Sequence, residues 1–145
     1  MNIAEIVSRL IKKCKTSNPF ELANALGIKI LLEELGNIKG YYNKPLRMKQ
    51  IHINCNLDRQ AQLFTCAHEL GHAILHPNAS TPFLRSSTLL SVDKMEIEAN
   101  EFATILLIPN EVILENRNLT VEQLSRLVGY EQSLIELRLK SCREM

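Results

Sequence analysis

Ala67-His68-Glu69-Leu70-Gly71-His72 is the stretch around which the chain is organised. On a helix, His68 and His72 are one turn apart and project from the same face, so both imidazoles can bind one metal ion. Glu69 stands next to the first histidine, where its carboxylate can take a proton from a water molecule at the metal. This is the His-Glu-x-x-His arrangement of zinc hydrolases. The motif therefore predicts a single bound Zn²⁺, with His68 and His72 as ligands and Glu69 as the general base.

The motif lies in residues 57–75, a stretch with the pattern of an amphipathic helix. No proline interrupts it, and Asp58 stands where a helix would begin. Its apolar residues recur at three-and-four spacing, and they are Leu57, Ala61, Phe64, Ala67, Leu70, Ala73 and Ile74. This context favours a metal site over a surface helix with two ordinary histidines. Cys66 lies about 200° around the helix from His68, so we expect it in the core and not as a ligand.

A third metal ligand is expected from the next predicted helix, residues 94–108. A stripe of mainly small residues runs along that helix at three-and-four spacing, namely Glu96, Ala99, Asn100 and Ala103. Small residues allow a neighbouring helix to approach closely, and Glu98 lies about 200° away from this face. The geometry thus favours Glu96 over Glu98, although Asp93 and Glu96 also form a capping-box pattern that competes for the glutamate. Asn100, one turn beyond Glu96, is suited to hold the second ring nitrogen of a ligand histidine.

Composition sets bounds on the class of protein. With 145 residues and 46% hydrophobic composition, residues 1–145 are expected to form a single domain with a buried core. The net charge of +1 gives no reason to expect a general polyanion-binding surface. No apolar run is long enough to span a bilayer, and the N-terminus lacks the pattern of a secretory signal. The four cysteines form no Cys-x-x-Cys pair and are expected to be reduced thiols in a cytoplasmic protein.

The remaining pattern predicts an α+β fold. The expected elements are helices at 3–15 and 20–26, strands at 28–32, 41–43 and 50–54, and an irregular connection at 77–92. The strands are expected to form a small, mainly antiparallel sheet that precedes the metal helix. Residues 119–142 predict a helical hairpin with a turn at Gly129. This order of helix, turn and helix is similar to that of a DNA-reading helix-turn-helix. Its second helix is rich in leucine and poor in basic residues, so we expect packing or docking to a protein and no direct nucleic-acid binding.

Other polar residues are weaker candidates. His76 is one turn beyond His72 and is expected to be a helix-end histidine. His52 is out of phase with Ile51 and Ile53, so it either lines the floor of a cleft or meets solvent. A peptidase also needs a donor for the developing oxyanion. The sequence does not choose among the candidates, which are Tyr41, Tyr42, His52, Tyr130 and Arg138.

Three longer stretches together resemble the ImmA/IrrE family of metallopeptidases. They are residues 67–76, residues 96–103 with the later Leu106-Leu107-Ile108-Pro109, and the lead-in formed by residues 18–23, 26–28, 40–42 and 51–54. The resemblance covers roughly residues 17–140. It implies a zincin-like, thermolysin-type catalytic core with extra C-terminal helices, and it implies Glu96 as the third zinc ligand. The resemblance also implies that the substrate of mobile-element and phage members is a helix-turn-helix repressor encoded nearby.

The sequence therefore predicts a cytoplasmic zinc endopeptidase that cleaves a helix-turn-helix repressor and has no membrane partner. By analogy with similar zinc peptidases, a strand edge near residues 41–43 could bind the substrate in extended form. The alternatives are an anti-repressor that acts by binding alone and a toxin–antitoxin component that binds a partner protein.

Overall fold

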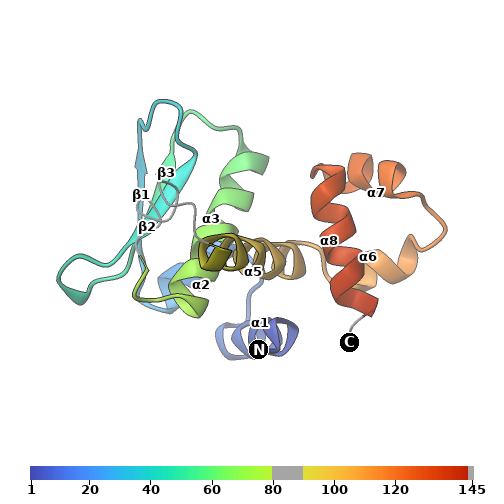
Figure 1. Ribbon diagram of the computed structural model, residues 1–145, viewed down its shortest axis with the longest axis horizontal. Coiled ribbons are helices and arrows are strands. Elements are labelled where there is room, and N and C mark those ends of the chain that lie inside the picture. The colour runs from blue at the N-terminus through green and yellow to red at the C-terminus, as the bar shows by residue number, and fades with distance from the viewer. Residues whose placement is uncertain (80–89, 144–145) are drawn as a thin grey trace.

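The computed structural model describes residues 1–79 and 90–143, with the side chains of 90–93 and 143 left aside (Figure 1). Most of the irregular connection predicted at 77–92 lies outside the described residues. The elements are α1 (Ile3–Cys14), α2 (Pro19–Ala25), β1 (Lys29–Glu33), β2 (Gly40–Asn43), the 3₁₀ helix η1 (Pro45–Arg47), β3 (Gln50–Asn54), α3 (Arg59–Leu75), α5 (Leu90–Leu107), α6 (Asn110–Glu115), α7 (Val121–Val128) and α8 (Gln132–Arg143). The predicted α+β class is confirmed. No helix among the described residues is long and apolar enough to cross a membrane.

Side-chain caps explain where several helices begin. Asp58 is the N-cap of α3, and its carboxylate accepts a hydrogen bond from the backbone N–H of Ala61. Thr120 and Gln123 form a capping box at the start of α7. These side chains satisfy backbone donors that have no partner within the first turn. The predicted start of the next helix at Asp93 is wrong, because residues 90–93 already belong to α5. Glu96 therefore lies inside the helix, where no N-terminal cap competes for it.

The three strands form a mixed sheet in the order β1-β3-β2. β1 pairs with β3 in parallel and β2 pairs with β3 in antiparallel orientation, so the expectation of a mainly antiparallel sheet is wrong. The reason is the length of the connections. A tight hairpin would have paired β1 with β2, but residues 34–39 carry the chain past the position of β3, which then fills the gap between them. As a result, β2 is an edge strand.

Helix α3 covers one face of this sheet. Tyr42, Ile51 and Ile53 are fully buried and belong to the core that α3 shares with the sheet. Gly40 allows the close approach, because a Cβ atom there would lie 2.6 Å from Cγ2 of Thr65 on α3. Side chains alternate along a strand, so His52 projects from the other face of the sheet, away from α3.

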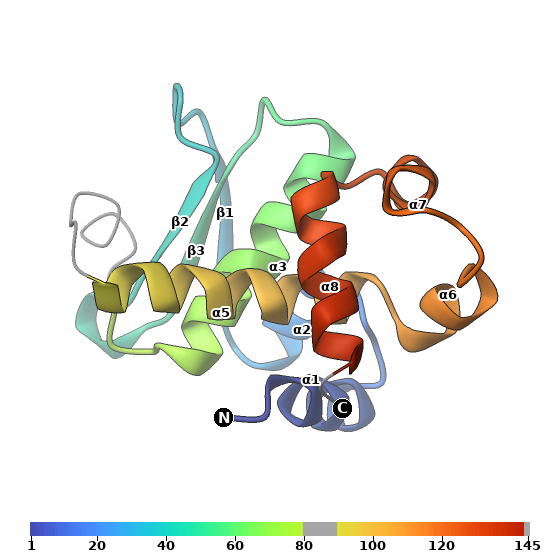
Figure 2. The ribbon, with the colours of Figure 1, turned by 45° about the vertical axis from the view of Figure 1, so that its right-hand side comes forward.

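Helix α5 crosses α3 on the side away from the sheet (Figure 2). The helices meet at Gly71, where a Cβ atom would lie 3.1 Å from Cβ of Phe102 and 3.2 Å from the Cα and carbonyl oxygen of Ala99. The small-residue stripe expected from the sequence is thus the contact face of α5. This crossing carries Glu96 and Asn100, which precede and follow Ala99 on α5, to the histidines of α3.

The C-terminal helices α6, α7 and α8 pack around a second hydrophobic cluster at the far end of α5 from the sheet (Figure 1). The hairpin predicted at 119–142 is confirmed as α7, a left-handed Gly129 with a φ of 85°, and α8. Arg138 is only 1% exposed and joins α8 to the end of α5, because its Nε donates to the carbonyl of Ile108 at 2.7 Å. The turn of the hairpin returns to α3, where Gln60 donates to the carbonyl of Val128 at 2.6 Å.

Candidate metal centre

Three side chains from α3 and α5 converge on one point. His68 Nε2 lies 2.9 Å from one carboxylate oxygen of Glu96, and His72 Nε2 lies 2.9 Å from the other. Their potential ligand atoms all lie within 4.8 Å of one another. His72 is fully buried and His68 nearly so, whereas Glu96 is about one-third exposed on the open side. Two imidazole nitrogens and one carboxylate oxygen are a donor set that suits zinc and leaves a fourth position for water or substrate.

The electrostatics of the cluster favour a cation at this point. Burial alone would raise the pKa of the Glu96 carboxyl, but hydrogen bonds with His68 and His72 and their positive charge hold that pKa far below its usual range. Burial alone would lower the pKa of His68, yet its hydrogen bond to Glu96 and the charges of Glu69 and Glu96 raise it above 6.5. The negative charges of Glu69 and Glu96 beside the ring nitrogen of His68 thus favour a bound cation at this point.

Glu69 lies beside the cluster and has no solvent exposure. Its negative charge raises the pKa of His68. Burial raises the pKa of the Cys66 thiol to about 12. The charge of Glu69 also raises this pKa, and the charge of Arg59 lowers it. Cys66 is fully buried in the hydrophobic core, as the sequence predicted, and it is not part of the three-residue cluster.

Asn100 fixes the orientation of His68. The amide oxygen of Asn100 lies 2.7 Å from His68 Nδ1. Because an amide oxygen only accepts, His68 Nδ1 carries a proton and donates it, which makes Nε2, 2.9 Å from Glu96, the nitrogen that can bind a metal. The structure brings Asn100 to the position where the sequence expected it.

His76 and Glu98 continue the network on the other side of the cluster. His76 is the C-cap residue of α3, but its side chain is buried and its Nδ1 lies 3.0 Å from Nδ1 of His72. Its Nε2 lies 3.0 Å from a carboxylate oxygen of Glu98. The sequence did not predict this role, although it shows two signals of it: the one-turn spacing from His72 to His76 and the second glutamate of Glu96-x-Glu98.

The oxyanion candidates are spread over the molecule. Tyr41 and His52 stack on each other, with ring centroids 4.2 Å apart, on the sheet face away from α3. His52 does not meet solvent, because it is 7% exposed, and its ring nitrogens contact Glu33 and Asn43. The Tyr42 hydroxyl donates to the carbonyl of Pro77 at 2.6 Å. These contacts join Tyr41, Tyr42 and His52 to residues outside the three-residue cluster.

Ring contacts connect Tyr130 with the cluster. Its ring centroid lies 5.7 Å from that of Phe64, and Phe64 in turn lies 6.3 Å from the ring of His68. Arg138 is held at the end of α5 by the carbonyl of Ile108 and by Oδ1 of Asn110, 2.7 Å away. A chain of ring contacts thus links Tyr130 through Phe64 to His68.

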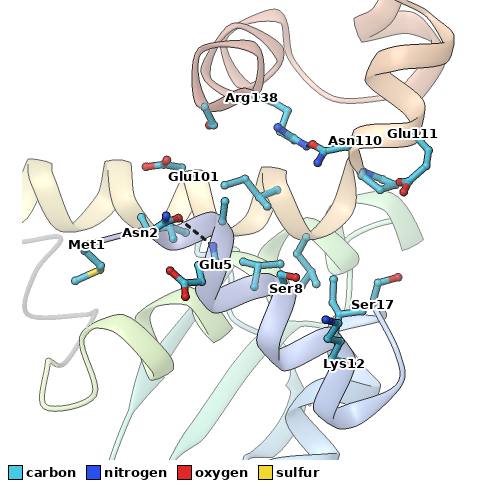
Figure 3. Close-up of a pocket in the computed structure, with 18 residues that line it drawn as sticks. Met1, Asn2, Glu5, Ser8, Lys12, Ser17, Glu101, Asn110, Glu111 and Arg138 are labelled. Atoms are coloured by element: carbon cyan, nitrogen blue, oxygen red, sulfur yellow. Dashed lines mark hydrogen bonds between the residues drawn. The ribbon is translucent and has the colours of Figure 1, made fainter. Parts of the chain in front are cut away.

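A separate cavity of about 990 Å³ lies between α1, the end of α5 and the C-terminal helices (Figure 3). Arg138, Asn110 and Glu101 line its wall, and Glu5 and Lys12 line it from α1. None of the residues of the three-residue cluster lines this cavity. The cavity and the candidate metal centre are distinct features of the described part of the chain.

The sequence profile of the peptidase family described as the IrrE N-terminal-like domain matches residues 23–140. The chain belongs to the ImmA/IrrE family. The resemblance found in the sequence is thereby confirmed, and with it membership of a family of metallopeptidases.

Two relatives of this ImmA/IrrE chain come from Bacillus and one of its phages. "Uncharacterized immunity region protein 2" of Bacillus phage phi105 is 45% identical over 94% of this chain and 88% of its own length. "Metallopeptidase ImmA" of Bacillus subtilis (strain 168) is 35% identical over 75% of this chain and 64% of its own length. A solved structure of a "Mycobacterium tuberculosis transcriptional regulator" has a TM-score of 0.62 at 18% identity, over 94% of this chain and 46% of that one. This last likeness concerns the fold alone.

Proposed function

We propose that this ImmA/IrrE chain is a zinc-dependent endopeptidase with a zincin-like core. The observation that carries the proposal is the convergence of His68, His72 and Glu96 on one point, with the buried carboxylate of Glu69 beside it. His68, His72 and Glu96 would hold one Zn²⁺. When bound, the ion would polarise the peptide carbonyl and make the attacking water more acidic.

The protein side chains perform the proton transfers in this proposal. Glu69 takes a proton from the water as it attacks the carbonyl and returns it to the leaving amine. Glu69 has no solvent exposure, so its carboxylate is kept away from bulk water. Asn100 keeps His68 in the orientation that the metal needs. The open side of the cluster, where Glu96 is about one-third exposed, is the side on which a substrate would enter.

The proposed substrate is a helix-turn-helix repressor encoded near the gene for this chain. A 45% identical relative is named an immunity region protein of a phage, which supports a role connected with repressors. We propose that the substrate binds in extended form along β2, because β2 lies at the edge of the sheet and next to α3. Slower amide hydrogen exchange in residues 40–43 on addition of the substrate would support this binding mode, and unchanged exchange there would contradict it.

The test is a mixing experiment with products identified by mass spectrometry. The zinc-loaded protein is incubated with the neighbouring helix-turn-helix protein, with and without a chelator, and the wild type is compared with Glu69→Gln. We expect one discrete cut that the chelator abolishes and that Glu69→Gln slows by about 100-fold or more, with zinc still bound. Glu111→Gln, an exposed glutamate on α6, is the matched control and should cleave like the wild type.

Other results would contradict the proposal. Full activity of Glu69→Gln would show that Glu69 is not the base. A partner that co-purifies intact in a fixed ratio, unaffected by Glu69→Gln, would instead identify a protein that acts by binding, as an anti-repressor or as part of a toxin–antitoxin pair.

A further inference from the structure

We infer that His76 and Glu98 are positioning residues that hold His72 in the one tautomer able to bind a metal through Nε2. The inference rests on the zinc-binding function proposed above. It concerns a row of four side chains in which Glu96, His72, His76 and Glu98 follow one another, each in contact with the next.

The row lies largely out of contact with water. The His72 side chain has no exposure, that of His76 is 7% exposed, and that of Glu98 is 18% exposed. Its three contacts measure 2.9 Å from Glu96 to His72, 3.0 Å between the two histidines and 3.0 Å from His76 to Glu98. Water therefore has little access to these ring nitrogens, and the side chains of the row must satisfy one another.

The position of each proton follows from the partners. The Glu98 carboxylate only accepts hydrogen bonds, so His76 Nε2 carries a proton and donates it. In a neutral ring, His76 Nδ1 then has a lone pair and accepts. The facing nitrogen, His72 Nδ1, must donate. This leaves the lone pair of His72 Nε2 directed toward Glu96.

In this tautomer, His72 Nε2 and the nearest oxygen of Glu96, which lie 2.9 Å apart, can both offer a lone pair to a cation held between them. The other ligand, His68, is oriented by the neutral amide of Asn100, whereas His72 is oriented by an imidazole that a carboxylate polarises. A carboxylate behind a ligand histidine makes its metal-binding nitrogen more basic.

The test is zinc affinity, measured by competition with a chromogenic chelator. We expect Glu98→Ala and His76→Ala to bind zinc about 10- to 100-fold more weakly than the wild type, the usual cost of losing a partner of a ligand histidine. Glu98→Gln keeps an acceptor oxygen at the same position, so its loss should be smaller than that of Glu98→Ala. It also serves as the conservative variant if Glu98→Ala folds poorly.

A matched control exists on the sheet. Glu33 contacts Nδ1 of the buried His52, so Glu33→Ala breaks a histidine–glutamate pair of the same kind away from α5. Glu33→Ala should leave the zinc affinity unchanged. Circular dichroism and thermal unfolding in the presence of a chelator would show that each variant is folded.

A second readout is the ¹⁵N NMR spectrum of the histidine rings in the zinc-loaded protein. We expect the proton of His72 on Nδ1 and that of His76 on Nε2. A His76 ring protonated on Nδ1, or folded Glu98→Ala and His76→Ala variants with wild-type zinc affinity, would overturn the inference while leaving the zinc peptidase intact. A wild-type protein that binds no zinc would overturn both.

Discussion

Two buried histidine sites in this molecule use similar residues and have different capabilities. The sheet site consists of His52 with Glu33 and Asn43, and the helix site consists of His68, His72 and Glu96. In the sheet site, both ring nitrogens of the single histidine are taken up by side-chain oxygens. In the helix site, partners hold one nitrogen of each histidine, and the two remaining nitrogens converge on one carboxylate.

The difference shows that convergence of lone pairs, and not residue type, makes a metal site. On α3, one turn separates His68 and His72 and places them on one face. On the sheet, the neighbours of His52 come from the two strands that flank β3 and surround one ring. In the described residues, only the helix site gathers three potential metal ligands.

The largest effect that separates the two sites should come from removing their glutamates. Glu96→Ala should weaken zinc binding by more than about 100-fold, beyond the usual cost of losing a supporting hydrogen bond, because it removes a ligand. Glu33→Ala should not change zinc affinity. Chelator competition measures both, and equal losses in the two variants would show that the sites do not differ in the way described.

His52→Ala is expected to have a smaller effect, and to change the stability of the protein without changing its zinc affinity. This variant loses the hydrogen-bonding contacts to Glu33 and Asn43 and the stack on Tyr41. The free energy of unfolding of the metal-free protein should fall by about 2 kcal/mol, while zinc affinity stays the same. Urea unfolding in the presence of a chelator measures the first quantity. A tenfold loss of zinc affinity in His52→Ala would tie the sheet site to the metal centre and contradict the comparison.

The third prediction concerns pH, because protons and zinc compete for the same nitrogens of the helix site. The neighbouring carboxylates raise the pKa of His68 above 6.5 despite the opposing effect of burial. Below that raised pKa, zinc must displace a proton, so its affinity should rise by about tenfold per pH unit as the pH increases. Above it, this contribution should level off. Chelator competition at a series of pH values would show the slope, and an affinity that is constant across the pH range around the raised His68 pKa would contradict the assignment.

The smallest effect is expected from Gly71→Ala, which probes how closely α5 approaches α3. The new Cβ would lie 3.1 Å from Cβ of Phe102 and 3.2 Å from backbone atoms of Ala99, which cannot rotate away. Overpacking costs about 1–3 kcal/mol, and the gain in helix propensity offsets up to about 1 kcal/mol of this. We expect a net loss of stability of about 1 kcal/mol and a loss of zinc affinity smaller than that of Glu96→Ala. A more stable variant with unchanged zinc affinity would show that the crossing has room to spare.

The sequence predicted the parts of the molecule that depend on spacing along one helix. The shared face of His68 and His72 follows from one turn of α3. The approach of Glu96 follows from the small residues that accompany it on α5, because Gly71 and Ala99 meet there. Both signals are local, so the expected helices formed and brought these residues together.

Contacts between distant segments were harder to predict. The parallel pairing of β1 with β3 depends on how residues 34–49 cross the sheet, which no alternation of side chains reveals. The contact between His76 and Glu98 depends on the angle at which α5 crosses the end of α3. From the sequence, His76 was predicted to be a helix-end histidine and Glu98 was the less favoured candidate for the third ligand. Their common role follows only from the contact between them.

The central claim is that His68, His72 and Glu96 hold a single zinc ion. The most direct measurement is X-ray absorption at the zinc edge, with metal content, for the purified zinc-loaded protein. The account predicts one zinc per chain with only nitrogen and oxygen neighbours at about 2.0–2.2 Å, including two imidazoles. A sulfur neighbour at about 2.3 Å, or a single imidazole in the wild-type spectrum, would contradict it.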